Sequence, residues 1–326
     1  MKNKYVFVAV MLALILILGL GVAAISVNEN NSIETDEDFV VVTSFYPMYI
    51  AAMNVIGDAP GVTLKNLSEP QTGCLHDFTL TPEDMKLLST ADVFIINGGG
   101  IESFMEEIAD AYPDLVIIEA SEGIDLLEQE SGEGHDHDHE EEKEADDHDG
   151  HHHDVNAHVW MSVAKYRAQV ANICVGLKET NPANAVEYER NTAEYDEKLV
   201  FLQEKQQAVA KALAEREVIL FHSAFAYLTK EYGMDVAFCM DLDEERQISA
   251  QEVAKTVSLI KEHGVKILLA EAEYGQKMCE TIQGEVDVRV LYLDPLNKGD
   301  YQADSYLDAM EANISKLQSL LENEGK

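Results

Sequence analysis

Short, continuous apolar runs recur along the chain after residue 38, and segments with helical patterning separate them. The runs occupy residues 39–43, 62–66, 92–97, 115–119, 218–222, 235–238, 265–271 and 288–293. Strands that are apolar throughout are typical of parallel sheets covered by helices on both faces. The pattern predicts an α/β fold with two lobes, each a roughly four-stranded parallel sheet flanked by helices.

The stretch between the two groups of runs predicts one long helix. Its apolar side chains recur at spacings of three, four and seven: Tyr188, Tyr195, Leu199, Leu202, Val209 and Leu213. Residues 182–215 contain no glycine, and their only proline is the first residue. A helix of this length would run about 50 Å and join the lobes. The alternative, a hairpin of two shorter helices, lacks a turn signal. We therefore predict lobes at 39–181 and 216–326, joined by this helix.

The N-terminus is typical of an exported protein. Lys2 and Lys4 precede an uncharged apolar run at residues 5–24, and small residues follow near Ala24. The run is also long enough to span a bilayer, so residues 1–26 are either a cleaved signal peptide or an anchor. Residues 27–38 are polar and form a tether. Membrane attachment through this segment remains open.

Acidic residues are spread along most of the chain and are not confined to one segment, and the formal net charge is −38. Nucleic acid is excluded as a partner because phosphate binding needs a basic face. A strongly negative surface instead concentrates cations.

Histidines gather between Gly134 and Trp160. Seven of them stand among acids in an apolar-free segment: His135, His137, His139, His148, His151, His152 and His153. We interpret residues 131–154 as a disordered loop that collects divalent cations of the zinc class. The competing interpretation is a solvated charge run with incidental histidines.

The four cysteines, Cys74, Cys174, Cys239 and Cys279, form no C-x-x-C pair, which excludes a cysteine zinc knuckle. Export permits disulfides, but their pairing stays open. Cys74 stands two residues before His76 and could bind metal. The role of an ordinary buried thiol is the more frequent one, and we predict that role here.

Three histidines outside the loop stand beside predicted strands or helix starts. His76 precedes a helix that Thr81 and Pro82 should open, His158 follows the loop, and His222 ends a strand. Ligand sites in α/β folds lie at such edges. His263, before Gly264, is predicted to end a helix and not to bind metal.

The motifs around these residues resemble the solute-binding proteins of zinc and manganese ABC importers. The resemblance covers residues 39–326 and rests on TSFYPMY, LHDFTLTPEDMKLLSTADVFIINGGGIESF, NAHVWMS, LFHSAFAYLTKEYG, ISAQEV, LLAEAEY and LYLDPL. It implies a metal held between the lobes by His76, His158, His222 and, in many members, an acid matching Asp294. Two departures occur, where Cys74-Leu75 and Asn156-Ala157 replace the family's Asp-Pro.

The donor set implied by the resemblance suits zinc. Three imidazoles with one carboxylate or water make a four-coordinate Zn²⁺ site, whereas Mn²⁺ favours more oxygen donors. Some manganese members carry Glu where this chain has His222, which also favours zinc. Glu271 ends a strand, where it is either an outer partner of a ligand imidazole or a solvated carboxylate.

The export-type N-terminus and the resemblance together imply an exported, monomeric Zn²⁺ receptor on the outer face of the cytoplasmic membrane. The resemblance further implies that it delivers the ion to an ABC permease. It is not predicted to be an enzyme, because the chain lacks H-E-x-x-H and G-x-S-x-G motifs and its Gly98-Gly99-Gly100 run lacks the remainder of a phosphate loop. The alternatives are an exported zinc buffer or sensor without a transport role, and a manganese-binding member of the same family.

Overall fold

The computed structural model describes residues 38–69, 72, 74–75, 78–129, 155–240 and 249–322, and the described residues from Val40 onward belong to one compact unit. Several predictions concern residues outside this part of the chain: the signal or anchor at 1–26, almost all of the tether, the loop at 131–154 with its seven histidines, and His76. Among the described residues, every helix falls short of the length or the hydropathy that a membrane span needs.

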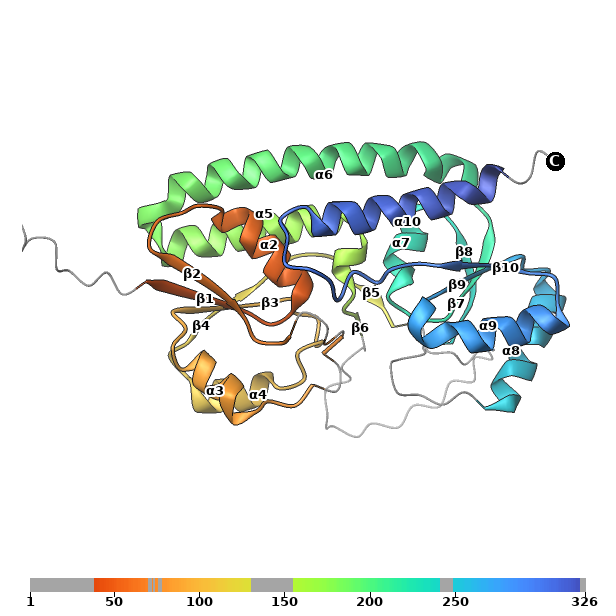
Figure 1. Ribbon diagram of the computed structural model, residues 1–326, viewed down its shortest axis with the longest axis horizontal. Coiled ribbons are helices and arrows are strands. Elements are labelled where there is room, and N and C mark those ends of the chain that lie inside the picture. The colour runs from red at the N-terminus through yellow and green to blue at the C-terminus, as the bar shows by residue number, and fades with distance from the viewer. Residues whose placement is uncertain are drawn as a thin grey trace, which may run out of the picture. The chain divides into compact units, whose positions relative to one another are not determined.

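The first lobe is built on a four-stranded sheet in the order β2-β1-β3-β4 (Figure 1). Its strands are β1 (Phe39–Thr43), β2 (Val62–Asn66), β3 (Val93–Ile96) and β4 (Val116–Glu119). Strand β3 pairs in parallel with both β1 and β4. Helices α2 (Tyr46–Ile56) and α5 (Val163–Thr180) lie on one side of this sheet, and α3 (Pro82–Leu88) and α4 (Met105–Ala111) lie on the other.

The second lobe repeats this plan with a parallel sheet in the order β10-β9-β7-β8. Its strands are β7 (Glu217–Leu220), β8 (Asp235–Cys239), β9 (Ile267–Ala270) and β10 (Arg289–Tyr292). Its helices are α7 (Phe225–Glu231), α8 (Ala250–His263), α9 (Ala272–Glu285) and α10 (Ser305–Glu322). Residues of β9, such as Leu268, are fully buried in a core with α8 and α9. The predicted two-lobed α/β fold is confirmed.

One unbroken helix, α6 (Ala185–Leu213), joins the two sheets and packs against α2, α5 and α10 (Figure 1). Its 29 residues correspond to about 43 Å. It starts three residues later than predicted, because a 3₁₀ turn, η2 (Pro182–Asn184), comes first. All six apolar residues that predicted the helix are buried.

Helix ends follow the local sequence. Thr81 caps α3 through a capping box with Asp84, and Pro82 is the first helical residue, as predicted. A second capping box joins Ser249 to Glu252 at the start of α8. That helix ends at His263 with Gly264 in a left-handed conformation.

A short antiparallel ladder was not predicted. Strand β5 (Leu127–Glu128) pairs with β6 (Val155–Asn156), so that Leu127 faces Asn156. Two-residue strands are too short to show periodicity in a sequence. The ladder brings together the chain on both sides of residues 130–154, directly before His158.

The run Gly98-Gly99-Gly100 has a structural role. All three residues have positive φ, and a Cβ on Gly98 (φ 85°) would lie 2.2 Å from a side-chain oxygen of Glu119. Only glycine adopts this conformation without strain. The run thus turns the chain between β3 and α4.

Gly98→Ala should lower the free energy of unfolding by about 1–3 kcal/mol, the cost of a non-glycine residue in this conformation. Urea denaturation followed by circular dichroism measures the change. Gly284→Ala is the matched control, because Gly284 lies within α9 with open space where an added Cβ would stand, and it should be neutral or slightly stabilising. Equal effects of both substitutions would contradict the assigned strain.

Candidate metal site

The chain brings three predicted site residues to strand ends in the second lobe. His222 follows β7, Glu271 follows β9 at the position directly before α9, and Asp294 follows β10. His158 reaches the same region from the first half of the chain, between β6 and the 3₁₀ turn η1 (Val159–Met161). Because the strands are parallel, their carboxyl ends meet at one edge of the sheet.

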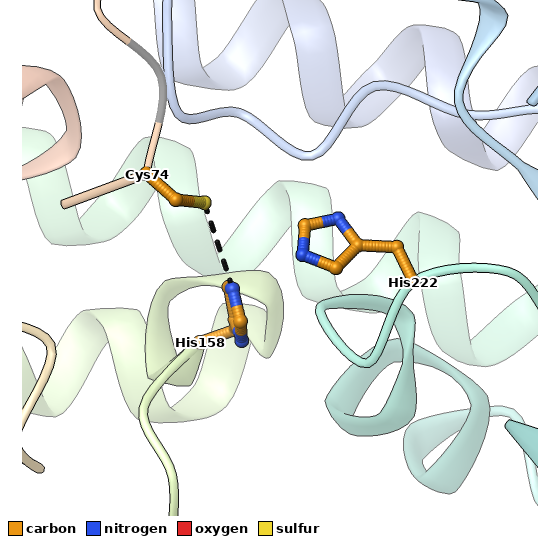
Figure 2. A group of neighbouring side chains, drawn as sticks. All are labelled: Cys74, His158 and His222. Carbon is orange, nitrogen blue, oxygen red and sulfur yellow. Dashed lines mark hydrogen bonds between the residues drawn. The ribbon is translucent and has the colours of Figure 1, made fainter. Parts of the chain in front are cut away.

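Three side chains form a group that could hold a metal ion (Figure 2). The thiol of Cys74 and the imidazoles of His158 and His222 each offer a ligand atom, and these atoms all lie within 4.8 Å of one another. Cys74 Sγ is 3.6 Å from His158 Nε2. The two imidazole rings are 4.9 Å apart and nearly perpendicular.

The His158 ring is held by a neighbouring amide. Asn156 Oδ1 lies 2.9 Å from His158 Nδ1 and accepts the backbone N–H of His158 at 3.0 Å. The orientation of that amide is set because its Nδ2 donates to the Ser223 carbonyl oxygen at 2.8 Å. Since Oδ1 only accepts, Nδ1 carries a proton and the Nε2 lone pair points toward Cys74. The replacement of the family's Asp by Asn156 thus retains the acceptor.

The His222 ring is held by a buried carboxylate. Glu271 Oε1 accepts a hydrogen bond from His222 Nδ1, and the two side chains are only 8% and 9% exposed respectively. This contact leaves Nε2 of His222 available to a metal. Carboxylate–imidazole pairs of this kind orient metal ligands and raise their basicity.

Asp294 is not part of the group. Its Oδ1 accepts the backbone N–H of Leu296 at 2.8 Å, which closes a turn around Pro295. Its backbone is fixed by the amide of Asn313 at 2.9 Å and 2.7 Å. Burial raises the pKa of Asp294, and the bond from Leu296 opposes that rise. The structure places this carboxylate beside Glu271 and Lys298 around a cavity of about 240 Å³.

Sequence reasoning gave Cys74 the role of an ordinary buried thiol, yet the structure leaves it only partly buried and places it in the group that could hold a metal ion. Asn297 was also overlooked. This buried residue follows β10 and donates from Nδ2 to Cys74 Sγ at 3.0 Å. One signal in the sequence could have indicated this role for Cys74. It stands two residues before His76, at a position where the family often carries an acid.

The family model for the periplasmic zinc-uptake complex component A matches residues 41–320. The chain belongs to this family. It is 33% identical to the high-affinity zinc uptake system protein ZnuA of Bacillus subtilis, over 86% of this chain and 87% of that protein. It is 27% identical over 88% of its length to the zinc-binding protein AdcA of Streptococcus pyogenes, but spans only 56% of that longer relative.

Solved structures support the same fold. The solute-binding protein FpvC of Pseudomonas aeruginosa, in complex with Ni²⁺, has a TM-score of 0.73 and 26% identity, covering 88% of this chain and 98% of that one. The same protein has also been solved with Mn²⁺. Zinc-uptake family members are solute-binding components of ABC importers that work with a membrane permease. FpvC has thus been solved with two different divalent metals.

Proposed function

We propose that this protein captures Zn²⁺ outside the cytoplasmic membrane, between its two lobes, and delivers the ion to the permease of an ABC importer. The observation that carries the proposal is the group at the lobe boundary, in which two imidazoles share a small space and each has its Nδ1 bonded to an oxygen acceptor. Such preorganised imidazoles are typical of zinc sites.

The proposed ligands are His158, His222 and His76, with Glu271 as the outer partner of His222. His76 lies outside the described residues, and the resemblance of its motif to the family supports its role. Asp294 remains the sequence-based candidate for the fourth position. Nitrogen and sulfur donors favour Zn²⁺ over Mn²⁺, so the manganese alternative is not favoured.

The family and the export-type N-terminus support a place on the outer face of the membrane, with either a cleaved signal or an anchor. We propose that the chain acts as a monomer with the permease as its partner. Its proposed role is binding and delivery, because the family to which the chain belongs consists of solute-binding components of zinc-uptake systems.

Calorimetric titration of the full chain with Zn²⁺ and with Mn²⁺ tests the proposal. We expect a tight Zn²⁺ event and much weaker Mn²⁺ binding. A pull-down of the metal permease by the zinc-loaded protein then separates delivery from buffering or sensing, since a buffer needs no permease. Preference for Mn²⁺, or failure to bind either ion tightly, would contradict the proposal.

The histidine-rich loop is proposed to collect zinc for the site. Deleting residues 134–154 should leave the fold intact, because β5 and β6 remain paired and the five residues 129–133 suffice for a hairpin connection. The deletion removes seven histidines and ten acids. The zinc stoichiometry measured by calorimetry should fall from more than one to one, and the remaining event should be the tighter.

The matched comparison replaces the seven loop histidines by serine and keeps the loop length. It should give the same stoichiometry of one. A truncated protein that binds no zinc tightly would show that the loop itself is the principal site.

A further inference from the structure

We infer that the Cys74 thiolate is a direct zinc ligand, in the position that the family resemblance assigns to a carboxylate. The inference rests on the proposed function and names the fourth donor of the same site. Two observations carry it. The Cys74 sulfur lies close to His158 and to Asn297, and the Asp294 carboxylate accepts a hydrogen bond within its own turn.

The separation of the donors already fits zinc coordination. A tetrahedral ion with Zn–S of about 2.3 Å and Zn–N of about 2.0–2.1 Å requires sulfur and nitrogen to lie about 3.5–3.6 Å apart. Cys74 Sγ and His158 Nε2 are 3.6 Å apart. The third donor, from His222, lies within 4.8 Å of both, so a small side-chain movement completes three corners of the tetrahedron.

The surroundings of the sulfur are those of a ligand thiolate. Asn297 Nδ2 donates a hydrogen bond to Sγ at 3.0 Å, and Asn297 is itself buried. An N–H directed at sulfur stabilises the thiolate, the form of cysteine that binds metals. This donor comes from the segment after β10, so the second lobe supports the sulfur supplied by the first.

Asp294, the carboxylate expected as the fourth ligand, lies outside the group formed by Cys74, His158 and His222. That carboxylate accepts the Leu296 N–H, and its backbone is held by Asn313. One of its two carboxylate oxygens is therefore engaged in the turn that precedes Asn297. Cys74 belongs to the group with the two histidines and Asp294 does not, so the observed contacts favour the sulfur.

The other cysteines have the character of core residues. Cys174, Cys239 and Cys279 are all buried, and burial raises the pKa of the Cys279 thiol to about 12. Cys74 is the only one of the four that is partly accessible. A soft thiolate beside imidazoles strengthens the preference for Zn²⁺ over harder ions such as Mn²⁺.

Cobalt substitution tests the inference on the full, reduced chain. Co²⁺ bound to a thiolate gives a near-ultraviolet charge-transfer absorption, which imidazole and carboxylate ligands do not produce. The histidine-rich loop contains no cysteine, so its ions cannot contribute this band. The wild type should show the band, Cys74→Ser should lose it and Cys174→Ser should keep it. Zinc affinity should fall by about 10-fold or more in Cys74→Ser only.

A second measurement needs no variant. Iodoacetamide labelling of the wild type, read by mass spectrometry, should modify Cys74 in the zinc-free protein and become slow when Zn²⁺ saturates the site. A wild type that binds Co²⁺ and Zn²⁺ tightly without the band, and whose Cys74 is alkylated equally fast with zinc, would overturn the inference and leave the proposed function standing. A wild type that binds no metal tightly would instead overturn the proposed function.

Discussion

Replacement of His158 by alanine should reduce zinc affinity by more than about 100-fold while the protein stays folded. Removing even an outer partner of a metal ligand costs 10–100-fold in affinity, so removal of a ligand costs at least that. His158 is almost fully buried and lies within reach of both other donors. Titration against a zinc chelator of known affinity measures the loss. His222→Ala and His76→Ala should behave in the same way.

His263→Ala is the matched control for these three variants. This histidine occupies the last turn of α8, outside the metal-binding group, and its removal should not change zinc affinity. The site would be wrongly assigned if His263→Ala weakened binding as much as His158→Ala did.

Trp160→Ala should lower the free energy of unfolding by about 3–5 kcal/mol. The indole is completely buried, and its ring meets Phe45 edge to face at 5.1 Å. Its Nε1 donates to the Pro295 carbonyl oxygen at 2.8 Å, so the substitution also leaves a buried acceptor in the second lobe without this donor. Urea denaturation of the zinc-free protein measures the change.

Phe201→Ala gives the comparison for an aromatic side chain of α6 that is 59% exposed, and it should shift stability by no more than about 0.5 kcal/mol. Trp160→Phe retains most of the volume and should cost only part of the full effect. A Trp160→Ala protein within about 1 kcal/mol of wild type would show that the indole is not central to the packing.

The fold was predictable because its signals are local. Continuous apolar runs located all eight strands of the two sheets, spacing located α6, and Thr81 with Pro82 located the start of α3. The β5–β6 ladder could not be predicted, since its pairing of Leu127 with Asn156 depends on chain segments that are distant in sequence.

The site was predictable only in part. His158 and His222 could be proposed from their motifs, but the approach of Cys74 to them depends on how loops from two lobes meet. The same is true of Asn297, whose contact with Cys74 spans more than two hundred residues. Asp294 occupies the expected strand end, yet local competition from the Leu296 N–H decides where its carboxylate lies.

The contacts across the lobe boundary limit how the protein can move. Besides the bond from Trp160 to Pro295, Tyr166 stacks on Tyr306 at 3.7 Å, and the Tyr306 hydroxyl donates to the Trp160 carbonyl oxygen. A hinge rotation wide enough to open the lobes would separate these buried groups and place them in water. Under the proposed function, we therefore expect loading and release of the ion to depend on the segments that carry His158 and His222, and not on rotation of whole lobes.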